Sequence, residues 1–389
     1  MKRFCLHNGL VLKNGENIMS DYEFVEFIEE PISRKKTPSN HNDISIGLLS
    51  GKLTCKLTAL SPILIPSLII DNDQDEGFRQ DFLNFYEIHG KKVIPASTLK
   101  GMLRATAEAL TNSCVSIFSG EYVHTFDNQI ETASIKLPNF ENIQTCSNIH
   151  ALCPACRIFG MASGFNTADN LFYRGKISIS DGVAESWIYD NPTTIIKLES
   201  PRPAREKIYQ KENFARGRKF YPHTENLEIK TDNKNDRGNI RPLKRGTQFE
   251  FTVFYKNLEE HELAILIQTI VLESGLKING DNSVTFSHNH PDKNKNGVYH
   301  KIGYGKPAGL GSCHIQITSC EVLNLYDRYT TSGSGINVQT NTNLQNWIQK
   351  YKQIFYKEFS IEPKFNDVTQ LTAPAYVKQL YKILCWPKD

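Results

Sequence analysis

Two half-buried strand patterns, far apart in the chain, constrain the fold more than any other feature. In KLTCKLTAL, which begins at Lys52, apolar and polar residues alternate strictly. In TQFEFTVFY, which begins at Thr247, aromatic and aliphatic residues again occupy every second position. A period of two residues is typical of strands that present one face to a core and the other to solvent. Both segments are therefore expected to be half-buried strands.

Each of these strands is followed along the chain by a helical pattern. Residues 97–112 place leucine and alanine at helical spacing, and Pro95 and Ser97 suit a helix entry. In the second helix, Asn257 and Glu260 match a capping box, and Gly275 is expected to end it. The second helix carries a continuous apolar stripe, made of Leu263, Leu266, Ile267, Ile270 and Val271.

Two further alternating segments complete the order of elements. RGKISISDG (174–182) and CHIQITS, after a glycine-rich loop at 302–311, both favour strands. The resulting β-α-β-β-α-β order predicts an α+β protein with a ferredoxin-like core, the topology of RNA-recognition modules. This RRM-like core spans 46–320, with large insertions at about 113–170 and 195–246. Residues 1–45 are expected to be an N-terminal arm, and 321–389 a helical C-terminal extension with helices near 343–358 and 373–384.

Composition places the chain in a broad class. Its 389 residues exceed the usual size of one domain, so two domains or one domain with large insertions are expected. With 39% hydrophobic and 22% charged residues it is an ordinary soluble globular protein. Neither a signal-peptide pattern nor a run of about 20 apolar residues is present, so we expect a cytoplasmic protein with no membrane partner.

Positive charge is concentrated in one segment. The chain carries a net charge of only +3, but residues 201–245 hold 13 Lys/Arg against 6 Asp/Glu. Within FARGRKFYPH, Arg216, Arg218 and Lys219 alternate with aromatic rings, and Arg241 follows in IRPLKRG. Cations that follow a phosphate backbone, combined with rings on which bases stack, are typical of single-stranded RNA binding. The alternative is a solvated basic loop.

Four of the nine cysteines fall within 43 residues, namely Cys114, Cys146, Cys153 and Cys156. The C-x2-C spacing of CPAC lets two thiolates meet one tetrahedral zinc ion, and the other two cysteines can complete the site. His124 and His150 are alternative ligands. The surrounding segment has little periodic apolar sequence, so a structural zinc ion would supply folding free energy. The alternative is a set of unliganded cysteines in a turn.

The helix start VIPASTLKGMLR and the loop GYGKPAGLG both suit an anion. Free amides, the hydroxyls of Ser97 and Thr98, and the cations Lys100 and Arg104 are expected to converge on one anion-sized site. In the loop, glycines allow positive φ and close approach of backbone amides, and two lysines flank them. The loop is no Walker A motif, because it lacks GK[ST] and precedes a strand. The alternatives are an amphipathic helix with a solvated face and a tight structural turn. The loop residues concerned are Lys301, Gly303, Gly305, Lys306, Gly309 and Gly311.

The tract DNDQDE follows the first strand and clusters three carboxylates, Asp71, Asp73 and Asp75. Carboxylates at this spacing can hold Mg²⁺ and so activate a water or a 2′-hydroxyl. The alternative is an acidic turn in solvent.

Taken together, four stretches carry a family resemblance: VIPASTLKGMLRATAEALTNSC, CPACRIFG, RGKISISDG and HKIGYGKPAGLGSCHI. In this order they resemble the RAMP superfamily of CRISPR-associated proteins, and within it the RNA-coating backbone subunits of type III effector complexes. The resemblance covers about residues 50–320 and is closest to a long, insertion-bearing subgroup. It departs from the family at Ala96, where a glycine is usual.

The resemblance implies an RRM-like subunit that binds the backbone of CRISPR RNA and assembles with other CRISPR-associated subunits in a ribonucleoprotein. In such proteins the Ser-Thr-Leu-Lys helix start and the glycine-rich loop face the guide RNA, and the cysteine insertion commonly holds zinc. Some relatives also cleave bound target RNA with an aspartate in the loop that holds the acidic tract here, although the family's G-G-x-D context is absent. The alternatives are an endoribonuclease that processes precursor CRISPR RNA, and a non-catalytic architectural or capping subunit.

Overall fold

The computed structural model describes most of the chain, including both predicted central strands. The described residues are 11–13, 16–18, 22–30, 47–67, 83–115, 121–126, 129–163, 171–196, 207–224, 237–273, 276–278, 284–286, 297–330, 333–362 and 372–386. The acidic tract with Asp71, Asp73 and Asp75 lies outside them.

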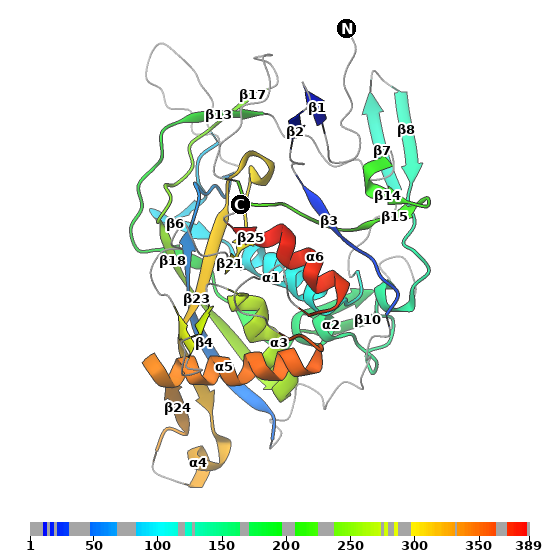
Figure 1. The fold of residues 1–389 in the computed structure, drawn as a ribbon. Coiled ribbons are helices and arrows are strands. Elements are labelled where there is room, and N and C mark those ends of the chain that lie inside the picture. Colours follow the sequence, from blue (N-terminus) through cyan, green and yellow to red (C-terminus); the bar gives the residue numbers. More distant parts are fainter. Residues whose placement is uncertain are drawn as a thin grey trace.

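A long antiparallel sheet forms the centre of the molecule (Figure 1). Its middle strand, β4 (Leu49–Ala59), pairs with β18 (Gln248–Leu258) on one side and β23 (Ser312–Leu323) on the other. Leu57 of β4 lies opposite Phe249 and Ile315, and all three side chains are buried. The predicted alternation of both strands is confirmed, because the period of two puts their buried apolar side chains on the helix-covered face, while Phe254 on the alternate register is 49% exposed.

Shorter strands extend this sheet, so that its described residues form nine strands in the order β22-β23-β4-β18-β12-β6-β5, with β11 paired to β18 and β24 to β23. The predicted strand in RGKISISDG corresponds to β11. The bounds of the added strands are β5 Glu87–Ile88, β6 Lys91–Ile94, β11 Ile177–Ile179, β12 Gly182–Ala184, β22 His300–Lys301 and β24 Ile336–Gln339.

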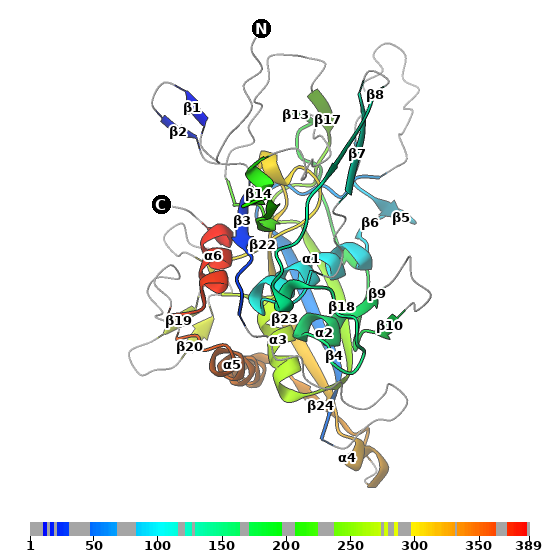
Figure 2. The same cartoon turned by 90° about the vertical axis from the view of Figure 1, so that its right-hand side faces the viewer.

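Helices cover one face of the sheet (Figures 1 and 2). They are α1 (Ala96–Leu110), α2 (Pro154–Phe159), α3 (Glu260–Val271), α5 (Asn341–Glu358) and α6 (Ala375–Leu384), while α4 (Leu325–Thr330) lies at the far end beside β24. The two predicted C-terminal helices are thus confirmed as α5 and α6. They dock on α3 through buried polar contacts: Lys352 Nζ lies 2.8 Å from Glu273 Oε2, and Gln268 Nε2 donates to Tyr381 Oη at 2.8 Å. The extension is therefore part of the main core.

The start of α3 differs from the predicted capping box. The N-cap is Glu259 rather than Asn257, and its backbone N–H donates to Glu262 Oε2 at 2.9 Å. Asn257 instead lies at the irregular end of β18 and has a positive φ of 55°. Leu272 follows the last turn with φ 48°, and Gly275 lies outside the described residues. The apolar stripe is buried as predicted.

Part of the predicted N-terminal arm belongs to the fold. Strand β3 (Glu23–Glu26) pairs with β16 (Gly217–Phe220) of the basic segment, and Val25 is fully buried. The Glu26 N–H also donates to Gln379 Oε1 of α6 at 2.9 Å. The arm and the basic segment therefore stabilise each other as a two-stranded sheet against α6.

Short strand pairs and 3-10 turns account for the remaining elements. The strands are β1 Val11–Lys13, β2 Glu16–Ile18, β7 Glu121–Phe126, β8 Gln129–Ser134, β9 Gly160–Ser163, β10 Leu171–Arg174, β13 Thr193–Ile196, β14 Gln210–Lys211, β15 Phe214–Ala215, β17 Arg237–Ile240, β19 Leu276–Ile278, β20 Val284–Phe286, β21 Gly297–Val298 and β25 Cys385–Trp386. The 3-10 turns are η1 Glu141–Ile143, η2 Lys207–Tyr209 and η4 Lys306–Ala308.

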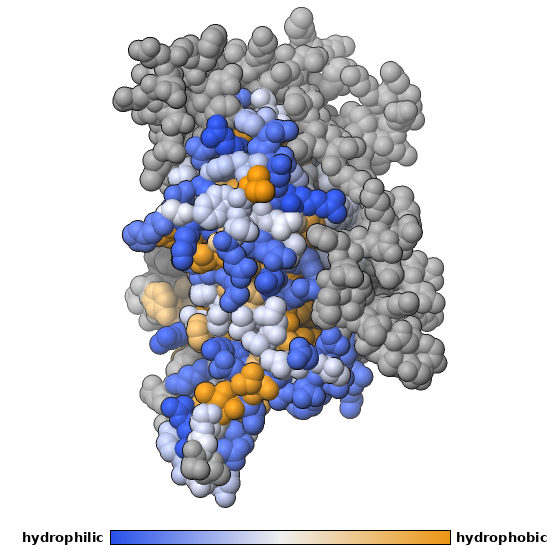
Figure 3. Space-filling model, turned by 90° about the vertical axis from the view of Figure 1, so that its left-hand side faces the viewer, coloured by the Kyte–Doolittle hydropathy of each residue, from blue (hydrophilic) through white to orange (hydrophobic). Residues whose placement is uncertain are grey.

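The other face of the sheet is mainly hydrophilic where the structure describes it (Figure 3). Lys52, Lys56 and Thr252 are only partly buried or exposed there, as the alternation requires. A hydrophobic patch lies toward the end that carries β24, whose Ile336 and Val338 side chains are exposed. In the described part of the chain, no helix combines the length and apolar character that a membrane crossing needs.

Candidate functional site

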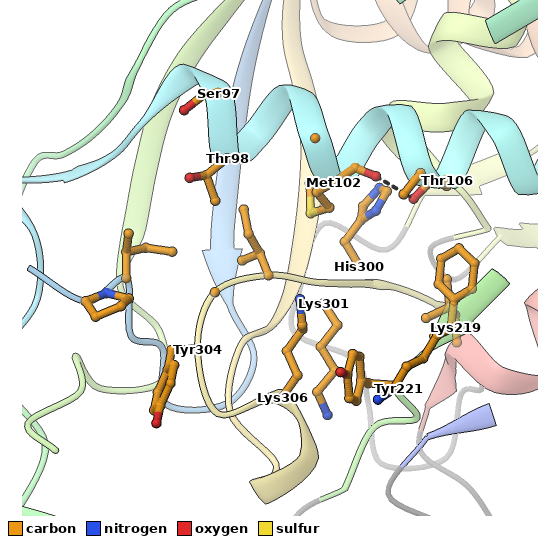
Figure 4. A pocket seen from close by; sticks show the side chains of 18 residues that line it. Ser97, Thr98, Met102, Thr106, Lys219, Tyr221, His300, Lys301, Tyr304 and Lys306 are labelled. Atoms are coloured by element: carbon orange, nitrogen blue, oxygen red, sulfur yellow. Dashed lines mark hydrogen bonds between the residues drawn. The ribbon is translucent and has the colours of Figure 1, made fainter. Parts of the chain in front are cut away.

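A pocket of about 490 Å³ lies between the first half of α1 and the glycine-rich loop (Figure 4). One wall is a single face of α1, which contributes Ser97, Thr98, Gly101, Met102, Ala105 and Thr106. The opposite wall comes from β22 and the loop after it, with His300, Lys301, Gly303, Tyr304 and Lys306. Lys219 and Tyr221, at the end of β16, lie on the same side as Lys306 (Figure 4). The pocket thus brings together three of the sequence motifs.

The helical repeat of α1 explains which of its side chains reach the pocket. Leu99, Leu103 and Ala107 bury one face against the sheet, so residues at i, i+4 and i+8 from Ser97 share another face. The helix start, however, is not free for a ligand as predicted. Asp181 Oδ1 accepts the Ala96 N–H at 2.7 Å, and the N-cap is Pro95 without a side-chain cap bond. The Asp181 carboxylate already stabilises the positive end of the helix.

Lys100 and Arg104 do not line the pocket, so the structure does not bring these two cations together with the hydroxyls of Ser97 and Thr98 there, and their contact with RNA stays a prediction. Arg104 points along a neighbouring face of α1, where its Nε lies 2.9 Å from Glu108 Oε1 and its Nη2 lies 3.6 Å from Cys156 Sγ. Burial opposes the charge of Arg104, but the hydrogen bond that Arg104 donates to Glu108 and the attraction of nearby negative charge together raise the Arg104 pKa. Burial and the nearby Arg104 charge lower the pKa of Lys100.

The glycines of the loop serve its tight fold. Gly303 has φ 87°, and a Cβ at this position would lie 2.4 Å from Leu64 O. Gly311 has φ 81°, and its Cβ would lie 1.8 Å from Ile302 O. Gly305 and Gly309 hold left-handed conformations at the two ends of the Lys306–Ala308 turn. Only glycine fits such positions, so the loop is a tight structural turn that also presents Lys306 to the pocket.

Three lysines line the pocket in different settings. Lys301 Nζ is buried and donates to Pro222 O at 2.6 Å. Lys219 Nζ lies 3.7 Å from the centre of the Tyr22 ring and donates to Tyr209 Oη at 2.9 Å. Lys306 Nζ lies 5.3 Å from the Tyr221 ring, and burial lowers its pKa. None of the described residues that line the pocket is acidic, so its electrostatic potential favours an anion.

Sequence reasoning did not single out Thr106, His300 and Tyr304, which also line the pocket. His300 Nε2 donates to Ile270 O at 3.0 Å, and burial lowers the His300 pKa to about 4. The ring is therefore neutral at pH 7, and its Nδ1 is a buried acceptor without a hydrogen-bond partner among the described residues. The sequence did carry a signal for two of these residues. His300 is the first residue of HKIGYGK, and Thr106 shares one helical face with Ser97 and Thr98.

The arginines of the basic segment lie outside the pocket. Arg216 Nε pairs with Glu26 Oε1 at 3.1 Å, and the Arg241 guanidinium lies 5.8 Å from the Tyr189 ring. Arg218 points inward, donating from Nη2 to Ser113 O, with its guanidinium 5.2 Å from the Phe27 ring. Of the four basic residues singled out in this segment, the structure brings only Lys219 to the pocket.

The four predicted cysteines form a second, buried cluster. Cys114 follows α1, Cys146 follows η1, Cys153 is the N-cap of α2, and Cys156 lies within α2. Their sulfur atoms all lie within 4.8 Å of one another, with Cys114 Sγ 3.5 Å from Cys156 Sγ and 3.6 Å from Cys153 Sγ. The described cysteines are free of disulfides. The arrangement offers four thiol ligands to one metal ion.

Of the alternative histidine ligands, His150 does not join this cluster. His150 is exposed and its backbone N–H donates to Asn148 Oδ1, while the side chain of His124 lies outside the described residues. The segment around the cysteines also contributes to the main core, through Leu152, Ile158 and Phe159. The segment, whose weak periodicity predicted no core of its own, therefore packs on the core of the whole protein.

Comparison with known proteins gives one family. The chain is similar to solved structures described as a Type IV-B CRISPR complex (18% identity, 69% of this chain, 90% of that chain, TM-score 0.32), Thermofilum pendens Csc2 (10%, 85%, 80%, 0.31) and the Type III-B Cmr-beta bound to cognate target RNA (10%, 70%, 61%, 0.31). No curated protein matches the chain. The family model of the RAMP superfamily matches residues 56–314, which include the pocket-lining part of α1, the cysteine cluster and the glycine-rich loop. The chain belongs to the RAMP superfamily.

Proposed function

We propose that this chain is an RNA-binding subunit of a type III CRISPR effector complex, which holds the backbone of CRISPR RNA and assembles with like subunits. The observation that carries the proposal is the pocket between α1 and the glycine-rich loop. It combines hydroxyls of Ser97 and Thr98 with the cation Lys306, and no described lining residue is acidic. Membership of the RAMP superfamily supports the same function.

The topology of the sheet is compatible with an RRM-like, ferredoxin-like core. In chain order the strands β4, β11, β18 and β23 alternate with helices, since α1 follows β4 and α3 follows β18. In space they lie in the order β23-β4-β18-β11, so the first and third strands are central. We infer that these six elements are the β-α-β-β-α-β unit, and that the remaining strands are insertions and extensions around it.

The pocket chemistry suits phosphate and sugar rather than a particular base. Lysine and hydroxyl groups contact phosphate oxygens, which position a nucleic acid without reading its sequence. The neighbouring rings of Tyr221 and Tyr304 offer flat surfaces on which an unpaired base can stack. A subunit that coats a guide RNA of variable sequence needs such contacts.

We also propose that the cysteine cluster binds a structural zinc ion. Four thiolates about 2.3 Å from a tetrahedral zinc ion have sulfurs about 3.8 Å apart, close to the 3.5 and 3.6 Å separations here. Cys114, Cys146, Cys153 and Cys156 would fill all four positions, so the ion would tie α2 and the end of α1 together. The ion would contribute folding free energy, and the thiolates leave no position for substrate.

Metal-dependent cleavage of bound target RNA stays a prediction, because Asp71, Asp73 and Asp75 lie outside the described residues. Replacement of all three by asparagine, with Mg²⁺-dependent cleavage of a paired target RNA as the assay, separates a cleaving subunit from an architectural or capping one. Processing of precursor RNA is disfavoured in the described pocket. Its imidazole, His300, has a pKa of about 4, far below the value near 7 that suits a general base at neutral pH.

The direct test is the salt dependence of RNA affinity. Lys306→Gln should weaken binding about equally for unrelated RNA sequences, and the slope of log K against log salt should fall by about 0.7 for one lost single-strand phosphate contact. Lys357→Gln is the matched control, because Lys357 is an exposed lysine at the far end of α5. Equal slopes for both variants, or no RNA binding by the wild type alone or within its complex, would contradict the proposal.

A further inference from the structure

We propose that Arg104 and Arg218 are positioning residues of the cysteine site, which balance the charge of a metal held by four thiolates and thereby couple metal binding to the pocket. This inference rests on the proposed zinc site and deepens the proposed function. It also assigns both arginines a role other than the RNA contact that the sequence suggested. The argument starts from where each guanidinium lies.

Arg104 bridges the metal site and its own helix. Its Nη2 donates toward Cys156 Sγ at 3.6 Å, while its Nε lies 2.9 Å from Glu108 Oε1, one turn further along α1. The side chains of Arg104 and Glu108 are largely buried, with 21% and 12% of their surfaces exposed. Glu108 therefore fixes the direction of the guanidinium, and a donor held in this way stabilises a metal-bound thiolate.

Arg218 reaches the same cluster from the other side. Its Nη2 donates to the carbonyl of Ser113, the residue before Cys114, and Ser113 Oγ accepts the Ala155 N–H of α2 at 3.2 Å. Burial lowers the pKa of Arg218, and the neighbouring charge of Glu108 opposes that shift. Its Nε is buried and has no hydrogen-bond partner in the described part of the chain. A buried cation in this setting needs a counter-charge.

Charge balance connects the two arginines to a loaded metal site. Four thiolates around a divalent cation carry two net negative charges and Glu108 adds a third, so the guanidinium groups of Arg104 and Arg218 offset two of these three charges. Arg104 places a donor at hydrogen-bond distance from Cys156 Sγ, and Arg218 places a second buried cation beside the residue that precedes Cys114. Both groups therefore stabilise a negatively charged, metal-loaded site.

Both arginines lie on elements that shape the pocket. Arg104 belongs to α1, whose other face carries Ser97, Thr98 and Thr106. Arg218 immediately precedes Lys219 in β16, and Lys219 and Tyr221 stand across the pocket from α1 (Figure 4). Loss of the metal is therefore expected to loosen both walls of the pocket together.

Metal affinity tests the assignment without any RNA. In a competition with a chromogenic chelator, Arg104→Gln and Arg218→Gln should each bind Zn²⁺ about 10–100-fold more weakly than wild type. The absorption spectrum of the Co²⁺-loaded variants should keep its tetrahedral thiolate signature, because the four ligands remain. Arg216→Gln, two residues before Arg218, and Lys100→Gln, one turn before Arg104, should leave the affinity unchanged.

Rescue and coupling complete the experiment. Arg218→Lys keeps the charge and should recover part of the affinity, and it serves if Arg218→Gln does not fold. On removal of the metal from the wild-type protein, amide hydrogen exchange should rise in both β16 and the first half of α1. Unchanged Zn²⁺ affinity in the Arg104 and Arg218 variants, a wild type that binds no metal, or exchange that rises only near the cysteines would overturn the proposal. If the Zn²⁺ affinities and the hydrogen exchange are as expected but the wild-type protein binds no RNA, only the proposed function would be contradicted.

Discussion

Removal of Arg157 tests how the cysteine-bearing helix α2 is held to the core. Arg157, in the CPACRIFG motif, is 2% exposed, and its Nε and Nη2 lie 2.7 Å from Glu262 Oε1 and 2.8 Å from Glu259 Oε1. Lys176 Nζ lies 2.7 Å from Glu262 Oε2, so two cations face two carboxylates in one buried group. Arg157→Met keeps the hydrophobic stem of the side chain and removes one of the two cations that face these two carboxylates.

The magnitude follows from what Glu262 retains. Loss of one partner from a buried ion pair costs about 3–5 kcal/mol, because the remaining charge stays desolvated. Glu262 keeps Lys176 and also accepts the Glu259 N–H at 2.9 Å. The lower end of the range, about 3 kcal/mol in the free energy of unfolding, is therefore expected for Arg157→Met.

Urea unfolding of the metal-loaded protein, followed by tryptophan fluorescence and by circular dichroism, measures this loss. Arg174→Met is the matched control, since Arg174 is an exposed arginine on β10, and its effect should stay within about 0.5 kcal/mol. A double-mutant cycle with Glu262→Gln should give a coupling free energy of at least about 1 kcal/mol. A loss below about 1 kcal/mol for Arg157→Met, with a single cooperative transition, would refute the electrostatic account.

Three further outcomes are expected. Burial opposes the charge of Glu26, but hydrogen bonds from Lys211 and Arg216 lower its pKa below 4.5. The contribution of Glu26 to stability is therefore complete above that pH and is lost as the pH falls through the lowered pKa. Glu26→Gln should flatten the acid limb of a curve of unfolding free energy against pH. Because burial lowers the Lys306 pKa from 10.5, RNA affinity should start to fall at a lower alkaline pH than for an exposed lysine, and Lys306→Arg should remove that early fall in a filter-binding titration. Gly303→Ala should lower the unfolding free energy by more than about 1 kcal/mol, whereas Gly101→Ala in α1, whose Cβ would meet no atom within 4 Å, should raise it by about 0.5–1 kcal/mol.

The regular part of the fold could be predicted from the sequence because it depends on local periodicity. The alternation in β4 and β18 and the stripe in α3 each place apolar groups on one face, and burial selects that face. The cysteine cluster could also be predicted, since few arrangements of CPAC with two more cysteines bring four thiols together. In these cases the residues that carry the pattern are the residues that make the contact.

The rest depends on partners that are distant in the sequence. Asp181 occupies the start of α1 from 85 positions away, and no local pattern connects the two. In charge and in sequence neighbours, Arg104 and Arg218 resemble cations that face solvent. In the structure both nevertheless lie inside the protein, near Glu108 and the cysteine cluster. Strand β3 pairs with β16 across almost 200 residues, so the predicted arm carried no signal of its pairing.

The electrostatics of the described cations also explain why the pocket, and not the basic segment as a whole, is the best candidate for RNA. Within the basic segment, Arg216 is neutralised by the carboxylate of Glu26, and the same is true of Arg157 in α2 with Glu259. A neutralised cation adds little to the long-range attraction of an anion. The Lys306 ammonium has neither a hydrogen bond nor an ion pair within the described residues, although the side chain is half-buried and burial lowers its pKa. Such desolvation of a lysine is unfavourable in the isolated protein, and a phosphate bound in the pocket would reverse it. The unfavourable position of Lys306 in the free protein is therefore the physical reason to expect an anionic ligand at this site.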